Sequence, residues 1–270
     1  MLKSVSALAG GGRVARRRRF SSLYNWSQHF AGGQQGYVLL PSRAETLFQD
    51  DAGSTPLTAA GQTVGRIMDV SGRDNHFTQS TSGFRPTYRL DTSDRAYLEF
   101  GGVDDFLSSG TITPGSDKVC VVLGIRKLSD ASTAALLEAS ANPNINAGSF
   151  WVLAPNLSNT YSFLSRGTGI GVVTSAASFA SPITNIVTGL GDISGDSTIL
   201  RVNGTQVASA ATDQGTGNFL AYQHFLGQRG GTSFPFSGRV YGVFVRYGGL
   251  PDATELAQIE AAMNDVTGAF

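Results

Sequence analysis

The chain has 270 residues, of which 41% are hydrophobic and only 15% are charged, with 34 glycines and a formal net charge of zero. This composition allows a full-size core and favours many short strands joined by tight turns, because a helical protein would be richer in Glu, Lys, Ala and Leu. The single cysteine excludes an intrachain disulfide and a cysteine-based zinc site. No run of about 18 apolar residues occurs, which excludes a membrane-spanning helix.

The net charge of zero hides an asymmetry along the chain. Residues 1–44 contain seven basic and no acidic residues, which leaves 13 basic and 20 acidic residues for 45–270. The first segment consists largely of Gly, Ser and Arg without an apolar period, a pattern typical of a segment that becomes ordered only against a partner. We therefore predict a basic N-terminal arm, residues 1–44, followed by one domain, residues 45–270.

Within the domain, short apolar runs predict strands. Residues 119–125 are apolar and rich in valine, which favours a central strand. Residues 150–153 and 161–164 flank a turn-rich linker and predict a hairpin. A second hairpin is predicted around Asn203-Gly204, because this dipeptide tolerates the positive φ angles of a type I′ turn.

The C-terminal part predicts a strand followed by a helix. Residues 240–247 form a long apolar strand, for which we expect Tyr241, Val243, Val245 and Tyr247 on one face. After Gly248-Gly249, residues 251–263 carry apolar side chains at the spacing of a helix. This helix is expected to lie on the folded domain.

Several of these pieces occur in the order of one known fold. They are an Asp-x-Ser-Gly-x-x-Asn-His turn at residues 69–76, Leu-Glu-Phe-Gly-Gly-Val-Asp-Asp at 98–105, the hairpin at 202–204 and the final strand and helix. Together they resemble the laminin-G-like, concanavalin A-type jelly roll, over about residues 45–266, and residues 44–56 resemble the versions found in tailed-phage structural proteins. The resemblance implies an all-β, antiparallel jelly-roll sandwich with an extended basic arm and a short C-terminal helix.

The resemblance also implies a function. It indicates a non-enzymatic structural protein of a phage virion: a capsid decoration, a head fibre or a tail component. The alternative is a carbohydrate-binding module for attachment to a host, with Trp151 and Tyr161 as the candidate glycan-binding residues. The alternative requires these rings to be exposed in a groove, whereas we expect them to be buried between the sheets.

The arm is predicted to anchor the protein to its particle. Arginine binds carboxylates and phosphates through a fixed fork of donors, and aromatic rings dock into grooves at little entropic cost. The anchoring residues are Arg16, Arg17, Arg18, Arg19, Tyr24, Trp26 and Phe30. We favour acidic surfaces of other virion proteins as their partner, over nucleic acid or no partner. For Tyr37 a place in a first strand is an equal alternative.

Two further expectations concern assembly and stability. The protein is expected to form a homo-oligomer, with a trimer favoured, because displayed virion components are commonly closed cyclic assemblies. The body is expected to stay folded without residues 1–42. We expect no membrane partner.

No catalytic constellation is evident in the sequence. The Glu-x-Asp-x-x-Glu strand of glycoside hydrolases with this fold is missing, there is no Gly-x-Ser-x-Gly elbow, and Cys120 lies in an apolar run where a thiol is inert. His29, His76 and His224 have no metal-ligand spacing. We predict neither an enzyme nor a cofactor.

Relatives of the fold hold calcium with aspartates at the rim of the sandwich. The corresponding candidates are Asp69, Asp74, Asp104 and Asp105. Aspartates in turns more often accept hydrogen bonds from their own backbone. We therefore predict no metal site.

Overall fold

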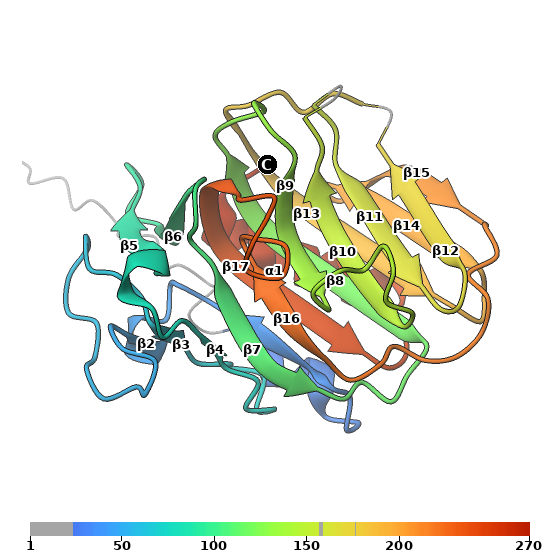
Figure 1. The fold of residues 1–270 in the computed structure, drawn as a ribbon, viewed down its shortest axis with the longest axis horizontal. Helices are drawn as coiled ribbons and strands as arrows, with labels where there is room; N and C mark the ends of the chain where they lie inside the picture. Colours follow the sequence, from blue (N-terminus) through green and yellow to red (C-terminus); the bar gives the residue numbers. More distant parts are fainter. Residues whose placement is uncertain (1–23, 157–158, 176) are drawn as a thin grey trace, which may run out of the picture.

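The computed structural model describes residues 24–156, 159–175 and 177–270. Two antiparallel sheets face each other in a sandwich, with one α-helix at the C-terminal end of the chain (Figure 1). The predicted fold class, an all-β antiparallel sandwich with a short C-terminal helix, is confirmed. In the part of the chain described, no helix is both long and apolar enough to cross a membrane.

The first sheet has eight strands, and its two long central strands are β8 and β17. The order is β15-β14-β13-β8-β17-β6-β5, and β1 also pairs with β17. The strands are β1 (Gly36–Leu39), β5 (Thr87–Leu90), β6 (Ala96–Gly101), β8 (Lys118–Lys127), β13 (Ile183–Asp192), β14 (Ser197–Val202), β15 (Thr205–Ala210) and β17 (Ser237–Tyr247). The run at residues 119–125 is therefore a central strand, as predicted.

The second sheet has nine strands in the order β12-β11-β10-β9-β16-β7-β4-β3-β2. They are β2 (Leu47–Phe48), β3 (Arg66–Ile67), β4 (Phe77–Thr78), β7 (Leu107–Ile112), β9 (Ala134–Ala139), β10 (Ser149–Ala154), β11 (Ser162–Arg166), β12 (Ile170–Thr174) and β16 (Tyr222–Leu226). Strands β10 and β11 form the hairpin predicted from residues 150–153 and 161–164. Three 3-10 helices complete the described elements: η2 (Trp26–Phe30), η3 (Ala44–Thr46) and η4 (Ser82–Phe84).

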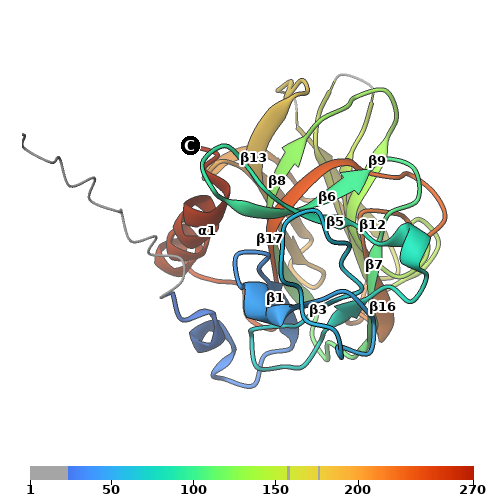
Figure 2. The ribbon, with the colours of Figure 1, turned by 90° about the vertical axis from the view of Figure 1, so that its left-hand side faces the viewer.

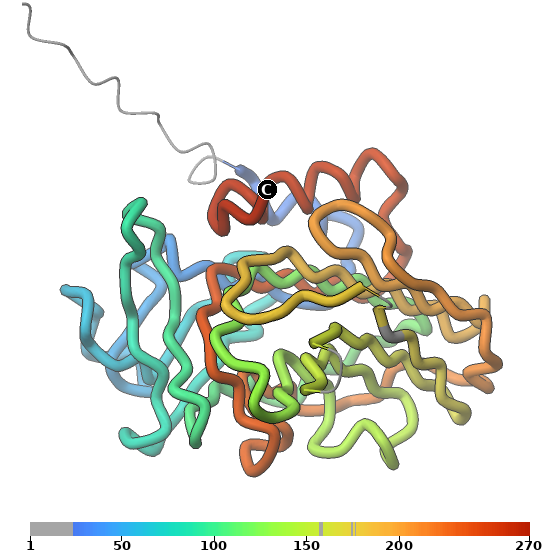
Figure 3. Tube along the Cα trace, turned by 90° about the horizontal axis from the view of Figure 1, so that it is seen from above, coloured from blue at the N-terminus to red at the C-terminus, as the bar shows by residue number. Residues whose placement is uncertain are grey.

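Helix α1 (Ala253–Thr267) covers the outer face of the eight-stranded sheet (Figures 2 and 3). The alternation of β8 explains this arrangement: Val119, Val121, Leu123 and Ile125 face the space between the sheets, while Cys120 and Val122 face the helix. The Asp252 side chain caps the helix by accepting from the Glu255 N–H at 2.8 Å. Both faces of this sheet are therefore buried at its centre.

The aromatic side chains predicted to anchor the arm belong instead to this same core. Trp26 and Phe30 are each 2% exposed and pack on Phe244 of β17, under α1. Tyr24 is half-buried, and its hydroxyl lies 2.7 Å from Nε2 of His29. The rings of Trp26 and Phe30 are closed to a partner, which corrects their anchoring assignment. Tyr24 keeps part of its surface exposed and packs edge-on against Trp26 of its own chain, with ring centroids 4.8 Å apart. Arg16, Arg17, Arg18 and Arg19 lie outside the described residues.

The sandwich also begins earlier than the predicted boundary at residue 45. Strand β1 pairs with β17 over four residues, and Tyr37, Val38, Leu39 and Leu40 are essentially inaccessible to solvent. Tyr37 therefore occupies a first strand. Removal of residues 1–42 would take β1 and η2 out of the fold. We therefore expect this truncation to destabilise the body, contrary to the expectation from the sequence.

The motif at residues 69–76 is a turn that fastens β1. Asp69 accepts hydrogen bonds from the backbone N–H groups of Val38, Ser71 and Asn75, at 2.8 to 3.1 Å, and from the Ser71 hydroxyl. The Asn75 amide donates to the Gly36 carbonyl at 2.7 Å. The polar residues of the motif thus serve the backbone, as turn chemistry favours.

Candidate functional site

The outer face of the nine-stranded sheet carries a hollow of about 390 Å³. Its lining residues are Thr78, Gln79, Ser80, Phe106, Ser108, Gln223, Phe225 and Gly230. This volume lies in the range of small-ligand sites, which typically combine apolar surface with a few placed polar groups. The hollow is therefore the candidate functional site.

Strand pairing assembles the floor of the hollow from distant parts of the sequence. Ser108 of β7 is opposite Thr78 of β4 on one side and Phe225 of β16 on the other. Because successive residues of a strand point to opposite faces, these three side chains share the outer face, while Leu107 and Leu226 enter the core.

Three phenylalanine rings form a row along this surface. The ring centroids of Phe106 and Phe225 are 6.5 Å apart, and those of Phe84 and Phe106 are 6.3 Å apart. Exposure falls along the row, from 37% for Phe84 through a half-buried Phe106 to 8% for Phe225. The row thus gives the hollow a partly exposed apolar wall that continues beyond it.

Arg85 holds one rim of the hollow in place. Its guanidinium donates to the carbonyl oxygens of Gln79, Ser80 and Gln49 at 2.7 to 2.8 Å. The Gln79 amide donates to the Phe106 carbonyl at 3.3 Å and accepts from the Thr81 N–H at 3.0 Å. These bonds fix the segment that carries Thr78, Gln79 and Ser80, so the rim is pre-organised.

A buried ion pair lies beside the hollow. Glu138 of β9 is opposite Phe225, is inaccessible to solvent, and accepts from Nε of Arg229 at 2.8 Å. Burial raises the pKa of Glu138 to about 7, against the opposing effect of Arg229. Gly230, whose φ is 53°, directly follows Arg229 in the sequence and lines the hollow. The ion pair therefore fixes the loop that forms this side of the site.

The two aromatic residues predicted to bind glycan are not exposed. Tyr161 has no accessible surface, packs between the sheets, and donates its hydroxyl to Asn185 at 3.0 Å. Trp151 faces outward from β10 but is only 6% exposed, in a cluster with Ala135, Leu153 and Leu164. As placed, neither ring can contact a ligand, which corrects their assignment. Burial between the sheets is confirmed for Tyr161, whereas Trp151 is buried on the outer side of its sheet.

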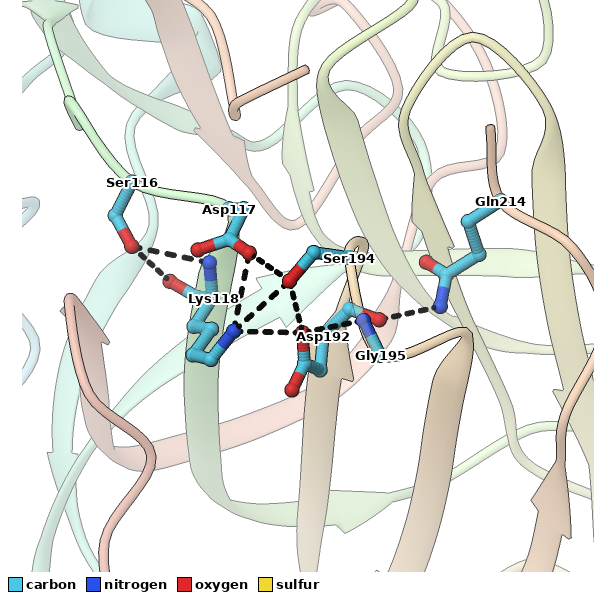
Figure 4. A network of polar contacts seen from close by, with 7 residues as sticks. All are labelled: Ser116, Asp117, Lys118, Asp192, Ser194, Gly195 and Gln214. Carbon is cyan, nitrogen blue, oxygen red and sulfur yellow. Dashed lines mark hydrogen bonds and ion pairs between the residues drawn. The ribbon is translucent and has the colours of Figure 1, made fainter. Parts of the chain in front are cut away.

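A second polar cluster joins the ends of β8 and β13 (Figure 4). Nζ of Lys118 lies 2.8 Å from Asp192, 3.0 Å from Asp117 and 3.2 Å from the Ser194 hydroxyl. The hydrogen bond with Asp192, opposed by burial and reinforced by Asp117, raises the pKa of Lys118. Because one ammonium lies between the two carboxylates, it pairs with both of them and the cluster forms a polar clip between the strands.

The cysteine and the three histidines considered for catalysis or metal binding are engaged in contacts that stabilise the fold. Cys120 is buried under α1, and burial raises the pKa of its thiol to about 12. His29 contacts Glu255 at 2.7 Å, His76 accepts from the Asp69 N–H at 3.0 Å, and His224 is enclosed by two tyrosines. Among the described residues, no three His, Cys, Asp or Glu side chains converge as metal ligands. Asp69 already accepts four protein hydrogen bonds, and Asp105 accepts from the Gly101 N–H.

No family model and no curated protein matches this sequence. Solved structures do match its fold. An arabinofuranosidase complexed with arabinofuranosyl-α-1,2-xylobiose has a TM-score of 0.59 at 14% identity, over 90% of this chain and 65% of that chain. Botulinum neurotoxin type C, whose cell entry depends on two ganglioside molecules, has a TM-score of 0.55 at 10% identity, over 87% of this chain and 53% of that chain. The CBM40 module of the Ruminococcus gnavus IT-sialidase, bound to α2,3-sialyllactose, has a TM-score of 0.43 at 20% identity, over 53% of this chain and 83% of that chain.

These comparisons show a β-sandwich fold shared with the arabinofuranosidase and the neurotoxin. The chain spans about two thirds of the matched arabinofuranosidase and about half of the matched neurotoxin chain. At these identities the likeness concerns the fold alone, since one fold carries unrelated functions.

Proposed function

We propose that this protein is a carbohydrate-binding module, and that the hollow beside Phe106 and Phe225 holds the glycan. The observation that carries the proposal is the combination of a phenylalanine row with hydroxyl and amide side chains in one pre-organised hollow. A sugar presents C–H faces that pack on aromatic rings and hydroxyls that exchange hydrogen bonds with Ser, Thr and Gln. Two of the structural neighbours, the arabinofuranosidase and the neurotoxin, are named with saccharide ligands, which supports the same proposal.

The proposal is tested by binding of the full-length protein to an immobilised oligosaccharide library. The wild-type protein should bind a subset of the library, and Phe106→Ala should weaken that binding by about tenfold or more, the cost of losing an aromatic contact worth over 1 kcal/mol. Phe270→Ala is the matched control, because Phe270 is also a phenylalanine, is 62% exposed and does not line the hollow. Absence of binding, or binding that is indifferent to Phe106, would refute the proposal.

The same proposal includes the absence of catalysis. Each of the five glutamates of the chain lies within ion-pair distance of an arginine: Glu45 with Arg43, Glu99 with Arg89, Glu138 with Arg229, Glu255 with Arg246 and Glu260 with Arg201. Glycoside hydrolysis needs two carboxylates that flank the scissile bond, and none of these glutamates lines the hollow. Incubation with arabino- and xylo-oligosaccharides should release no sugar, and sustained release by the purified protein would overturn this part.

A second candidate function is display of this module on a phage virion, which would place the protein in the virion as a capsid or tail component. Its support is the resemblance of residues 44–56 to phage structural proteins, and the opposite charges of residues 1–44 and 45–270. In this proposal Arg16–Arg19 contact acidic virion proteins, and a homo-oligomer, with a trimer favoured, multiplies weak glycan binding. Light scattering of the full-length protein tests the oligomer, and a monomer at micromolar concentration would remove it.

A further inference from the structure

The groups that the hollow offers to a ligand are all uncharged. Its described lining consists of two phenylalanine rings, hydroxyl and primary amide side chains, and one glycine. The uncharged lining indicates which class of glycan the hollow can bind, an inference that rests on the function proposed above.

The cations nearest to the hollow are directed to other partners. Arg66, opposite Thr78 in the pairing of β3 with β4, donates from Nη1 to the Ala52 carbonyl at 3.3 Å and lies against Gly53. Arg85 directs its guanidinium to three backbone carbonyls, and Arg229 is paired with the buried Glu138. Each would have to abandon these partners to meet a carboxylate or sulfate on a sugar. For Arg229 this would leave the Glu138 carboxylate buried without a cation, which is strongly unfavourable.

The polar groups that remain accessible suit neutral hydroxyls. Gln223 is exposed, and its Nε2 donates to the Ser108 hydroxyl at 3.3 Å, which leaves the amide oxygen and a second N–H for a ligand. A primary amide presents a donor beside an acceptor, and a sugar hydroxyl can act as either. A carboxylate or sulfate offers acceptors only. It can therefore pair with the N–H of the amide but not with the amide oxygen, and it loses its own hydration on binding.

The row Phe84, Phe106 and Phe225 adds a requirement for length. It runs from inside the hollow to a ring that is 37% exposed beyond it, so more than one sugar can lie on the row. We propose that the hollow selects neutral oligosaccharides of at least two sugars and rejects counterparts that carry a carboxylate or sulfate.

Titration calorimetry with matched pairs of ligands tests this selectivity. The pairs are lactose with 3′-sialyllactose, and xylo-oligosaccharides with the same chains bearing glucuronic acid, each at low and at high salt. The neutral member of at least one pair should bind about tenfold or more tightly than its acidic member, a difference of about 1.4 kcal/mol. Its affinity should be insensitive to salt, since no charge pair forms, and should fall in Phe106→Ala and in Phe84→Ala but not in Phe270→Ala.

The alternative results separate the inference from the function on which it rests. Tighter binding of the acidic members that is lost in Phe106→Ala would overturn the selectivity and leave a glycan site in the hollow. Binding of a monosaccharide as tightly as of its oligosaccharide would overturn the length requirement. Acidic binding that is weakened by salt and unchanged in Phe106→Ala, or no binding at all, would overturn both the selectivity and the proposed site.

Discussion

The phenyl rings of Phe106 and Phe225 meet with their centroids 6.5 Å apart and their planes tilted by 45°. One ring directly precedes β7 and the other belongs to β16, and the antiparallel pairing of these strands brings them together. Helix α1 buries the outer face of the opposite sheet with apolar side chains, whereas this pair leaves aromatic surface beside exposed polar groups. The two outer faces of the sandwich therefore differ: α1 packs over the centre of one, whereas the other carries the hollow.

The amide of Gln223 should contribute affinity without contributing stability. Gln223 is exposed, and a hydrogen bond has a net worth of about 0.5 to 1.5 kcal/mol, so Gln223→Ala should weaken glycan binding about two- to tenfold. Its unfolding midpoint in urea should match that of the wild type. An equal loss of affinity in Gln206→Ala, an exposed glutamine on β15, would show that the effect is not local to the hollow.

The tryptophan of the N-terminal segment should be essential for stability. Trp26 is 2% exposed under α1, and truncation of a buried aromatic typically costs about 3 to 5 kcal/mol, so Trp26→Ala should lower the free energy of unfolding by about that amount. Leu220→Ala is the control, because Leu220 is 50% exposed. Equal stability of the two variants in urea denaturation would place Trp26 outside the core.

His224 should make the protein sensitive to acid. The Tyr37 hydroxyl lies 3.0 Å from Nδ1 and the Tyr247 hydroxyl 3.1 Å from Nε2, and a neutral imidazole can accept from one and donate to the other. Burial lowers the pKa of His224 to about 3. The unfolded chain therefore takes up the proton first, so this contribution is complete above pH 6.5 and is lost as the pH falls toward 3, at about 1.4 kcal/mol per pH unit.

Urea unfolding of the wild type and of His224→Gln at neutral and at mildly acidic pH measures this contribution. Glutamine keeps one donor and one acceptor but does not titrate, so the variant should lose less stability on acidification. Parallel pH profiles would contradict the assignment. Should the variant fail to fold, Tyr247→Phe at neutral pH still tests the network, with an expected loss of about 1 to 3 kcal/mol for an unpaired buried nitrogen.

Glu138 should act in the opposite direction. Because burial raises its pKa to about 7, the folded protein holds a proton that the unfolded chain releases near pH 4.5. This contribution is complete below pH 4.5 and is lost as the pH rises through 7, to a total of about 3 kcal/mol. Glu138→Gln should therefore flatten the decline in stability between pH 5 and 8, as measured by urea unfolding. A decline as steep as in the wild type would show that Glu138 is not its source.

Local sequence signals predicted the framework well. The Asn203-Gly204 hairpin is present, with φ of 50° and 77°, because the turn type depends on those two residues alone. The C-terminal helix was predicted from its apolar spacing, and the structure adds the cap by Asp252. The face of Tyr241 was predicted incorrectly, because a register shift between Val240 and Gly242 turns it outward, onto Tyr97.

The site could not be read from local patterns. Phe106 and Phe225 lie far apart in the sequence, each directly before a leucine that enters the core, and only the pairing of β7 with β16 brings them together. Trp26 and Phe30 follow a Gly, Ser and Arg-rich segment and show no period, so their burial depends on α1, which is formed far away in the sequence. Tertiary contacts of this kind outweigh the local composition that suggested an exposed arm.

Mapping of backbone amide shifts by NMR during titration with a bound neutral oligosaccharide tests the central claim most directly. We expect saturable shifts centred on the lining residues Phe106, Ser108, Gln223, Phe225 and Gly230, with none at the polar clip around Lys118 and Asp192. Shifts confined to another surface, or a spectrum that does not change with any ligand that the protein retains, would contradict a glycan site in the hollow.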